Sequence, residues 1–254
     1  MLWQQTFAFR GYERNDGSHA QFLTVQGPQL HPKLPSLSFE EAGSYGLTLG
    51  TIHRALYHTL DIEPNKRLFV EGASTGTGYD CLRSAVSSGL SVVGMVSNTE
   101  RAARVQAIGG AAVDRKDPQW ANAFTPVPDD PAQWGAWEQD GESFVAASEA
   151  AAGGSIDYVV SHAGETAFPR SFQTLGEGGV LTFYGASSGY RFTFMGKKGS
   201  SSPADMFTRA GLRAGQSLLV VYGPGAEDGI VDRVAIEAIE VGCQRGAQIA
   251  VLVD

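Results

Sequence analysis

The stretch VEGASTGTGYD, which begins at Val70, places a run of small residues where an apolar segment meets a helical pattern. Glycine permits a tight turn there and lets backbone N–H groups approach a pyrophosphate, while the N-terminus of the following helix contributes partial positive charge. Small hydroxyl side chains add further hydrogen-bond donors. The glycines are Gly72, Gly76 and Gly78, and the hydroxyl residues are Ser74, Thr75 and Thr77. The pattern predicts a dinucleotide phosphate site.

The spacing of these glycines is GxxxGxG rather than the GxGxxG of the best-known dinucleotide fingerprint. A glycine-rich turn that merely packs tightly is the alternative, but a strand before it and a helix after it favour nucleotide binding. Short-chain dehydrogenases share this spacing, but they also need a Tyr-x-x-x-Lys pair for proton transfer. None of the eight tyrosines is followed by lysine four residues later, which disfavours that family.

The end of the next apolar run, MVSNTERAAR, indicates which nucleotide is bound. NAD sites usually carry an acidic residue there for the ribose 2′-hydroxyl, and NADP sites replace it with a basic group. Here Ser97 and Asn98 form a small polar tip, and Arg101 and Arg104 follow. Because arginine offers charge-assisted bidentate donors, this tip favours NADPH. Glu100 argues against NADPH, and a solvated helix face is the alternative reading of the two arginines.

Composition restricts the class of protein. A formal net charge of −8 over 254 residues disfavours nucleic acid and membrane surfaces as partners. The two cysteines, Cys81 and Cys243, lie far apart, and the five histidines are scattered, so no metal site is predicted. No signal peptide and no long apolar run are visible, so we expect a soluble, cytoplasmic protein.

The elements that must position these residues alternate between strands and helices from Arg67 onward. Such alternation predicts an α/β fold, a Rossmann-type doubly wound parallel sheet with helices on both faces. The expected strands are 67–72, 91–97, 111–115, 156–164, 178–189, 216–225 and 247–253, and the expected helices are 34–60, 76–88, 99–109, 138–151 and 228–244.

Three other parts of the chain carry expectations. Ser38 is expected to cap the first helix, and Thr99 the helix that begins there. The segment NDGSHAQFLTV is expected to be a turn and an alternating strand with Phe22 and Val25 as its apolar side chains. The segment 115–137, which is rich in proline and tryptophan, is expected to be an inserted loop that packs either on a partner domain or on its own domain.

The segments GYERNDGSHAQF, LTLGTIHRAL, EGASTGTG, DRKDPQW and SHAGETAFP, in this order, resemble the medium-chain dehydrogenase/reductase superfamily. Within it they are most similar to crotonyl-CoA carboxylase/reductases and, closer still, to the acrylyl-CoA reductase part of propionyl-CoA synthase. The resemblance spans about residues 5 to 215. It implies NADPH-dependent hydride transfer to the β-carbon of a short-chain 2-enoyl-CoA, with an acyl-CoA as substrate.

The resemblance also assigns positions around the cofactor. The loop from Gly72 to Gly78 would hold the pyrophosphate, and Ser97 and Arg101 would face the 2′-phosphate. The residues that it places beside the nicotinamide, its ribose and the phosphates are Thr48, Thr51, His162, Gly185 and Ala186. No residue is predicted to be catalytic, because the resemblance implies that the proton donor lies in a segment that this sequence lacks.

Two departures from the family qualify the expectation. Thr75 stands in place of one loop glycine, and the stretch that holds a CO2-binding histidine in carboxylating members reads AGQSLL, which predicts reduction without carboxylation. We further expect a domain fragment of a larger multidomain enzyme, inactive alone and binding NADPH weakly. A naturally short homologue is the alternative to such a fragment.

The expected organisation has three parts. Residues 1–38 would be a small β-rich remnant of a GroES-like catalytic domain, 39–223 the NADPH-binding Rossmann domain, and 224–254 an additional helix-strand unit. A homodimer could form through the sheet edge AQIAVLVD. An NADPH quinone oxidoreductase of the same superfamily and a non-enzymatic nucleotide-binding module are the alternative functions.

Overall fold

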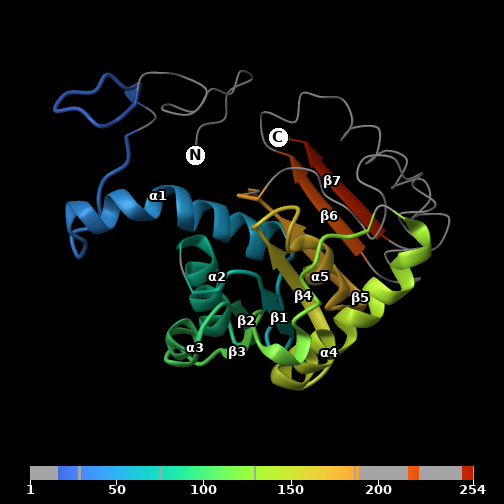
Figure 1. Ribbon diagram of the computed structural model, residues 1–254. Helices are drawn as coiled ribbons and strands as arrows, with labels where there is room; N and C mark the ends of the chain where they lie inside the picture. The colour runs from blue at the N-terminus through green and yellow to red at the C-terminus, as the bar shows by residue number, and fades with distance from the viewer. Residues whose placement is uncertain are drawn as a thin grey trace. The chain divides into compact units, whose positions relative to one another are not determined.

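The computed structural model describes residues 17–27, 30–74, 76–128, 130–185, 187–188, 217–222 and 248–253 (Figure 1). The chain divides into two units, Met1–Thr51 and Ile52–Asp254, each described here by itself. The helical elements are α1 (Phe39–His53), a π-helix (Arg54–Thr59), α2 (Gly76–Ser87), α3 (Thr99–Gln106), α4 (Trp134–Ala152), α5 (Phe168–Gln173), and two 3-10 turns (Pro118–Trp120 and Pro131–Gln133). The strands are β1 (Arg67–Val70), β2 (Ser91–Val96), β3 (Ala111–Asp114), β4 (Ile156–Ser161), β5 (Leu175–Phe183), β6 (Ser217–Tyr222) and β7 (Gln248–Val253).

The first unit contains most of α1, which begins with a reciprocal cap. The Glu41 N–H donates to Ser38 Oγ at 3.1 Å, and the Ser38 N–H donates to Glu41 Oε2 at 2.7 Å. This arrangement satisfies two backbone donors at the helix start, which confirms the predicted cap. The expected strand around Phe22 is wrong, because 17–27 and 30–38 contain no strand. A strand requires a hydrogen-bonded neighbour, and Phe22 is 90% exposed.

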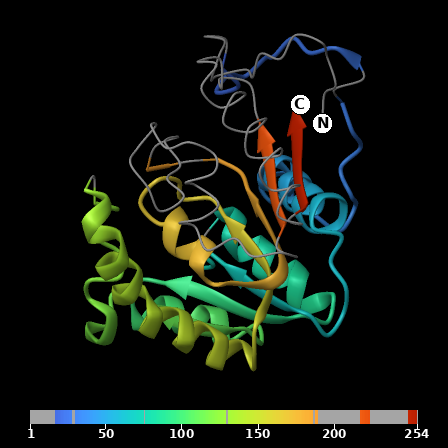
Figure 2. The ribbon, with the colours of Figure 1, turned by 90° about the vertical axis from the view of Figure 1, so that its right-hand side faces the viewer.

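The second unit is built on a seven-stranded sheet of order β3-β2-β1-β4-β5-β6-β7 (Figure 1). All six pairings are parallel. The predicted parallel α/β sheet is therefore confirmed. β7 lies beside β6 in this same sheet (Figure 2), so the strand predicted near the end of the chain extends the sheet. The predicted helix 228–244 lies outside the described residues.

Two apolar cores cover the two faces of the sheet, as the alternation of side chains along β1 requires. Leu68 and Val70 point into one core together with Leu82 of α2. Phe69 points into the other core, where it meets Phe144 of α4 edge-on at 6.1 Å between ring centroids. Helices therefore lie on both faces of the sheet, in agreement with the doubly wound architecture.

The segment 115–137 packs on its own unit. Trp120 and Trp137 are 8% and 3% exposed, and their indole N–H groups donate to Asp114 O at 2.8 Å and Thr125 O at 2.9 Å. Of the two readings offered for this loop, the described residues favour an ordered loop folded on its own domain. The loop is shorter than expected, because α4 already begins at Trp134.

Among the described α-helices, α5 is the one that the sequence pattern did not predict. It has six residues and starts FPR, so neither its length nor its composition is typical of a helix. Its Arg170 is 1% exposed and donates to the carbonyl oxygens of Ala123 and Trp137 and to Gln173 Oε1. The guanidinium also lies 3.5 Å from the centre of the Trp137 ring. Burial lowers the pKa of Arg170 to about 10, and Asp140 and Glu138 oppose that shift. Contacts distant in sequence therefore stabilise this helix.

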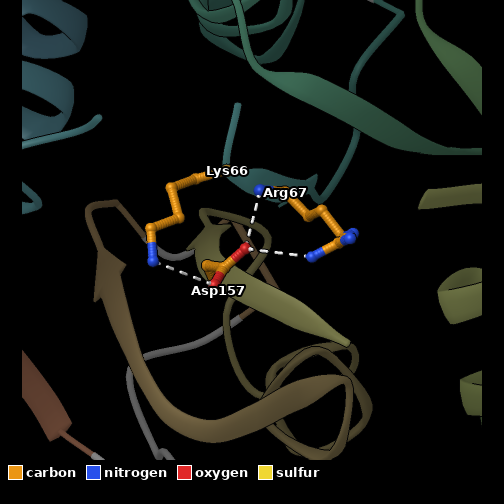
Figure 3. Close-up of polar contacts among 3 residues, drawn as sticks. All are labelled: Lys66, Arg67 and Asp157. Atoms are coloured by element: carbon orange, nitrogen blue, oxygen red, sulfur yellow. Dashed lines mark hydrogen bonds and ion pairs between the residues drawn. The ribbon is translucent and has the colours of Figure 1, made fainter. Parts of the chain in front are cut away.

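The amino ends of β1 and β4 are joined by a polar cluster (Figure 3). The Arg67 N–H donates to Asp157 Oδ2 at 2.8 Å, and Arg67 Nη1 lies 3.8 Å from the same oxygen. Lys66 Nζ lies 3.6 Å from Asp157 Oδ1. Because the strands are parallel, this cluster marks the edge of the sheet opposite the carboxyl ends.

Among the described helices, none is long and apolar enough to cross a membrane.

Candidate nucleotide site

The predicted site residues of the second unit gather at the carboxyl ends of four neighbouring strands, β2, β1, β4 and β5. The loop after β1 carries the glycines, Ser97 follows β2, His162 follows β4, and Gly185 follows β5. In parallel sheets this is the edge at which ligands bind, beside the strand where the order reverses. In this sheet β1 lies between β2 and β4, so the order of the strands reverses at β1. The glycine loop, which follows β1, therefore lies at that reversal.

The glycine loop is shaped by two different requirements. Gly76, the first residue of α2, has φ +53°, a left-handed conformation that favours glycine. Apart from its chain neighbours and the backbone of its own helix, no atom of the described residues lies within 4 Å of the position of a Cβ there. At Gly78 an added Cβ would lie 2.4 Å from the carbonyl oxygen of Gly72 and 2.8 Å from His162 Nε2. Gly78 therefore permits close packing inside the loop, whereas Gly76 leaves open space beside the start of α2.

His162 is packed beneath this loop. Its ring stacks on that of Tyr184, with 5.7 Å between centroids and 12° between planes. His162 Nε2 is buried and has no hydrogen-bond partner among the described residues. Burial also raises the pKa of Tyr184, whose hydroxyl oxygen is likewise buried without a hydrogen-bond partner among the described residues. The floor of the site thus combines an aromatic stack with a buried imidazole nitrogen that a ligand or a water molecule could satisfy.

The end of β2 brings together the residues predicted for the 2′-phosphate. Arg101 Nη1 donates to Ser97 Oγ at 2.8 Å, and both residues are accessible to solvent. Asn98 has a structural role, because its Oδ1 accepts the Arg101 N–H at 2.9 Å and caps α3. The predicted cap, Thr99, is wrong by one position, since the extended backbone of Asn98 is what an N-cap needs. Arg104 instead lies over the ring of Tyr79, 5.4 Å from its centroid.

The end of β5 is tied to that of β4 through one carbonyl. Ala163 O accepts the Ser188 N–H at 2.7 Å and is also the partner of the Ser188 hydroxyl. Gly185, with φ +62°, is exposed between the two strand ends. These contacts keep the residue next to His162 close to the loop that contains Gly185.

The other predicted positions are distributed as follows. Thr77 is half-buried at the start of α2, and Ser74 is 2% exposed. Thr48 and Thr51 lie on α1 in the first unit, where their hydroxyls donate to the carbonyl oxygens of Ser44 and Leu47 in their own helix. Thr75 and Ala186 lie outside the described residues. The parts of all these residues in cofactor binding stay predictions.

The structure adds one residue that the sequence analysis did not select, Glu71. It directly follows β1, is fully buried, and accepts hydrogen bonds from Ser161, Ala163 and Ser171. A charged residue between an apolar strand and a glycine loop was the available signal. Cys81, one turn into α2, is buried in the core, and burial raises the pKa of its thiol.

The residues present fit a phosphorylated dinucleotide. Gly76 leaves open space at the turn, and the N-terminus of the twelve-residue α2 contributes partial positive charge. The exposed Arg101 adds a full positive charge at the same edge of the sheet. Among the described residues, no group of three or more histidine, cysteine, aspartate or glutamate side chains could hold a metal ion.

Comparisons with known proteins point in the same direction. No protein-family model matches the chain. A crotonyl-CoA carboxylase/reductase from Cereibacter sphaeroides is 32% identical over 199 residues, 76% of this chain and 46% of that protein. A crotonyl-CoA reductase from Streptomyces avermitilis is 28% identical over 186 residues, 71% of this chain and 40% of that protein. The chain thus spans less than half the length of these curated relatives.

Among solved structures, crotonyl-CoA carboxylase/reductase AntE in complex with NADP has a TM-score of 0.65 and 22% identity. That similarity covers 95% of this chain and 63% of the other, and it supports the fold. The sequence relatives support the assignment of this chain to the medium-chain dehydrogenase/reductase superfamily, as a crotonyl-CoA carboxylase/reductase-like member.

Proposed function

We propose that this chain forms the cofactor domain for NADPH-dependent reduction of the C2=C3 double bond of a short-chain 2-enoyl-CoA, such as acrylyl-CoA. When bound, NADPH supplies the hydride that is added to the β-carbon. The observation that carries the proposal is the pairing of the open loop at Gly76 with the Ser97–Arg101 contact at the next strand end. The names of the relatives support reduction of an enoyl-CoA, and the NADP in a related structure supports the cofactor, whereas the carboxylase in one relative's name argues against the predicted lack of carboxylation.

Each part of the site has a physical role in this proposal. Backbone N–H groups at the start of α2 bind the pyrophosphate, because they lack partners within the helix. The guanidinium of Arg101 binds the 2′-phosphate by charge-assisted hydrogen bonds. The strand ends at His162 and Gly185 line the nicotinamide.

The test is nucleotide binding by the whole chain, followed by nicotinamide fluorescence. We expect tighter binding of NADPH than of NADH, and Arg101→Ala should weaken NADPH binding about tenfold while leaving NADH binding nearly unchanged. Arg104→Ala is the matched control. Arg104 lies on the same helix, but its guanidinium lies over the ring of Tyr79, whereas that of Arg101 contacts Ser97. Equal affinity for the two nucleotides, or equal effects of the two variants, would contradict an NADPH site at Arg101.

The substrate is tested separately, with the chain joined to the remainder of any larger enzyme that contains it. We expect oxidation of NADPH in the presence of acrylyl-CoA or crotonyl-CoA, and no label in the product from radioactive bicarbonate. Incorporation of label would show carboxylation and refute the non-carboxylating reaction. Turnover of quinones but not of thioesters would instead favour an NADPH quinone oxidoreductase. Nucleotide binding without either turnover would favour a non-enzymatic module.

A further inference from the structure

We propose that Glu71 is a positioning residue of the nucleotide site, which fixes the carboxyl end of β4 so that His162 stays beneath the glycine loop. This inference rests on the proposed binding of NADPH. It concerns the half of the site that faces the nicotinamide, on the β4 side of the loop. The adenosine half at Arg101 is built on β2 and α3, to which the Glu71 carboxylate makes no hydrogen bond among the described residues.

The contacts of Glu71 converge on both sides of His162. The Glu71 N–H donates to Val160 O at 2.9 Å, which prolongs the pairing of β1 with β4 by one residue. The carboxylate then accepts the Ala163 N–H at Oε1, at 2.6 Å, and the Ser161 hydroxyl at Oε2, at 2.7 Å. The residues immediately before and after His162 are therefore both bound to one buried side chain.

We call these hydrogen bonds of the Glu71 carboxylate to Ser161 and Ala163 the clamp, and a third contact extends the clamp to α5. The Ser171 hydroxyl donates to Glu71 Oε2 at 2.6 Å, and Ser171 is fully buried. Glu71 thus connects the end of β1, the end of β4 and α5 through one carboxylate. A side chain bound in three directions cannot shift without breaking a buried hydrogen bond.

The position of His162 matters because Gly72 and Gly78 of the loop leave no room for a Cβ beside the imidazole. The site of a Cβ on Gly72 lies 2.9 Å from His162 Cε1, and that on Gly78 lies 2.8 Å from Nε2. A small displacement of the imidazole would therefore press on the loop that binds the pyrophosphate, or would leave a gap beneath it. The clamp at Glu71 transmits its rigidity to the loop by this steric contact.

Stability alone gives no reason for an acid at this place. Burial of a carboxylate costs free energy even when it is hydrogen-bonded, and an apolar side chain of similar volume is often at least as stable. Directional hydrogen bonds supply what an apolar side chain lacks, which is a defined position for the two residues beside His162. The acid is thus explained by the need to position the site.

The experiment uses the whole chain, with NADPH and adenosine 2′-monophosphate as probes of the complete site and of its adenosine half. Glu71→Met should weaken NADPH binding about tenfold and leave the adenosine probe nearly unchanged. Glu71→Gln should bind both probes about as the wild type does, because its amide oxygen still accepts the Ala163 N–H and its NH2 group can donate to the serine oxygens.

A matched pair of serine variants keeps the test decisive if Glu71→Met does not fold. Ser161→Ala removes one hydroxyl from the clamp and should weaken NADPH binding about threefold. Ser148→Ala is the control, because Ser148 is equally buried but donates to Phe144 O within α4 at 2.8 Å. It should leave both affinities unchanged.

The outcomes separate this inference from the proposed function. Wild-type affinity for NADPH in Glu71→Met and Ser161→Ala would overturn the positioning role while leaving the NADPH site intact. An equal loss of both probes would also overturn it, since it would mark Glu71 as a general structural residue. Failure of the wild type to bind either probe would overturn the proposed function, and the positioning role with it.

Discussion

At the scale of single residues, the glycine loop combines two needs that the spacing GxxxGxG does not separate. Gly76 has a left-handed backbone and open space beside it, whereas Gly78 is closed in by Gly72 and His162. Gly76 leaves room for a ligand, whereas Gly78 lets the Gly72 carbonyl and the His162 imidazole pack closely against the loop. Substitutions at the two positions should therefore act by different physical routes.

Gly78→Ala tests the second need. The added methyl group would lie 2.4 Å from Gly72 O and 2.8 Å from His162 Nε2, so the loop and the imidazole must separate. We expect a loss of about 1 to 3 kcal/mol in the free energy of unfolding, measured with urea, and weaker NADPH binding. Gly135→Ala is the control, since an added Cβ there would have no atom of the described residues within 4 Å outside its chain neighbours and its own helix backbone, and it should be neutral or slightly stabilising. Unchanged stability of Gly78→Ala would contradict this packing.

Cys81 offers a second test at the same scale. Its side chain is fully buried, and burial raises the pKa of the thiol, so the reactive thiolate is scarce at neutral pH. We expect no alkylation of Cys81 by iodoacetamide in the native protein and rapid alkylation in urea, measured on the peptide by mass spectrometry. Raising the pH from 7 to 9 should not change this result, because the shifted pKa lies above that range. Rapid native labelling would show that α2 opens readily.

At the scale of elements, α5 is held by a buried cation rather than by its own sequence. Arg170 donates to carbonyl oxygens of the 115–137 loop and of α4, and it lies over the ring of Trp137. Ser171, its neighbour, binds Glu71. This short helix thus joins the proline-rich loop on one side to the nucleotide site on the other.

Arg170→Met should therefore destabilise the protein strongly. It leaves the carbonyl oxygens of Ala123 and Trp137 without their donors inside the core, and we expect a loss of about 3 kcal/mol. Arg170→Lys should recover little, because an ammonium group cannot reproduce the planar fork. The exposed Arg83 provides the control, and Arg83→Met should change the free energy of unfolding by less than about 0.5 kcal/mol. Full recovery by lysine would contradict the role of the fork.

The strand pair β1–β4 gives a contrasting prediction at its amino end. Asp157→Asn keeps an acceptor for the Arg67 N–H but removes both ion pairs, which are partly exposed and therefore weak. We expect a loss below about 1 kcal/mol for this variant and a larger loss for Asp157→Ala. NADPH affinity should be unchanged in both variants, because the cluster lies at the amino ends of the parallel strands β1 and β4, whereas the site lies at their carboxyl ends. A large effect of Asp157→Asn would mean that the ion pairs dominate.

At the scale of the whole molecule, nucleotide binding should stabilise the folded chain. A ligand at a hundredfold excess over its dissociation constant adds about 2.7 kcal/mol, which corresponds to a rise in melting temperature of about 5 to 10 °C for a chain of this size. We expect this rise with NADPH and a smaller one with NADH at equal concentration. Differential scanning fluorimetry measures both, and Arg101→Ala should abolish the difference. An equal rise with both nucleotides would contradict the preference for NADPH.

The sequence by itself determined the class of the fold and the place of the loop. Apolar runs, helix periodicity and glycine spacing are local signals, and β1, α2, β2 and β4 lie close to where these signals predict them. The contact of Arg101 with Ser97 follows in the same way, because the two residues are four apart on one strand-to-helix turn.

Only the tertiary structure decided which residues support the site. Glu71 meets Ser171 across 100 positions in the sequence, and Arg170 meets Ala123 across 47, so no local pattern contains either contact. The same reason explains why the predicted strand around Phe22 is wrong, because a strand forms only beside a hydrogen-bonded neighbouring strand. Local sequence fixes what each segment can form, while the identity of a buried polar partner depends on which segments the fold brings together.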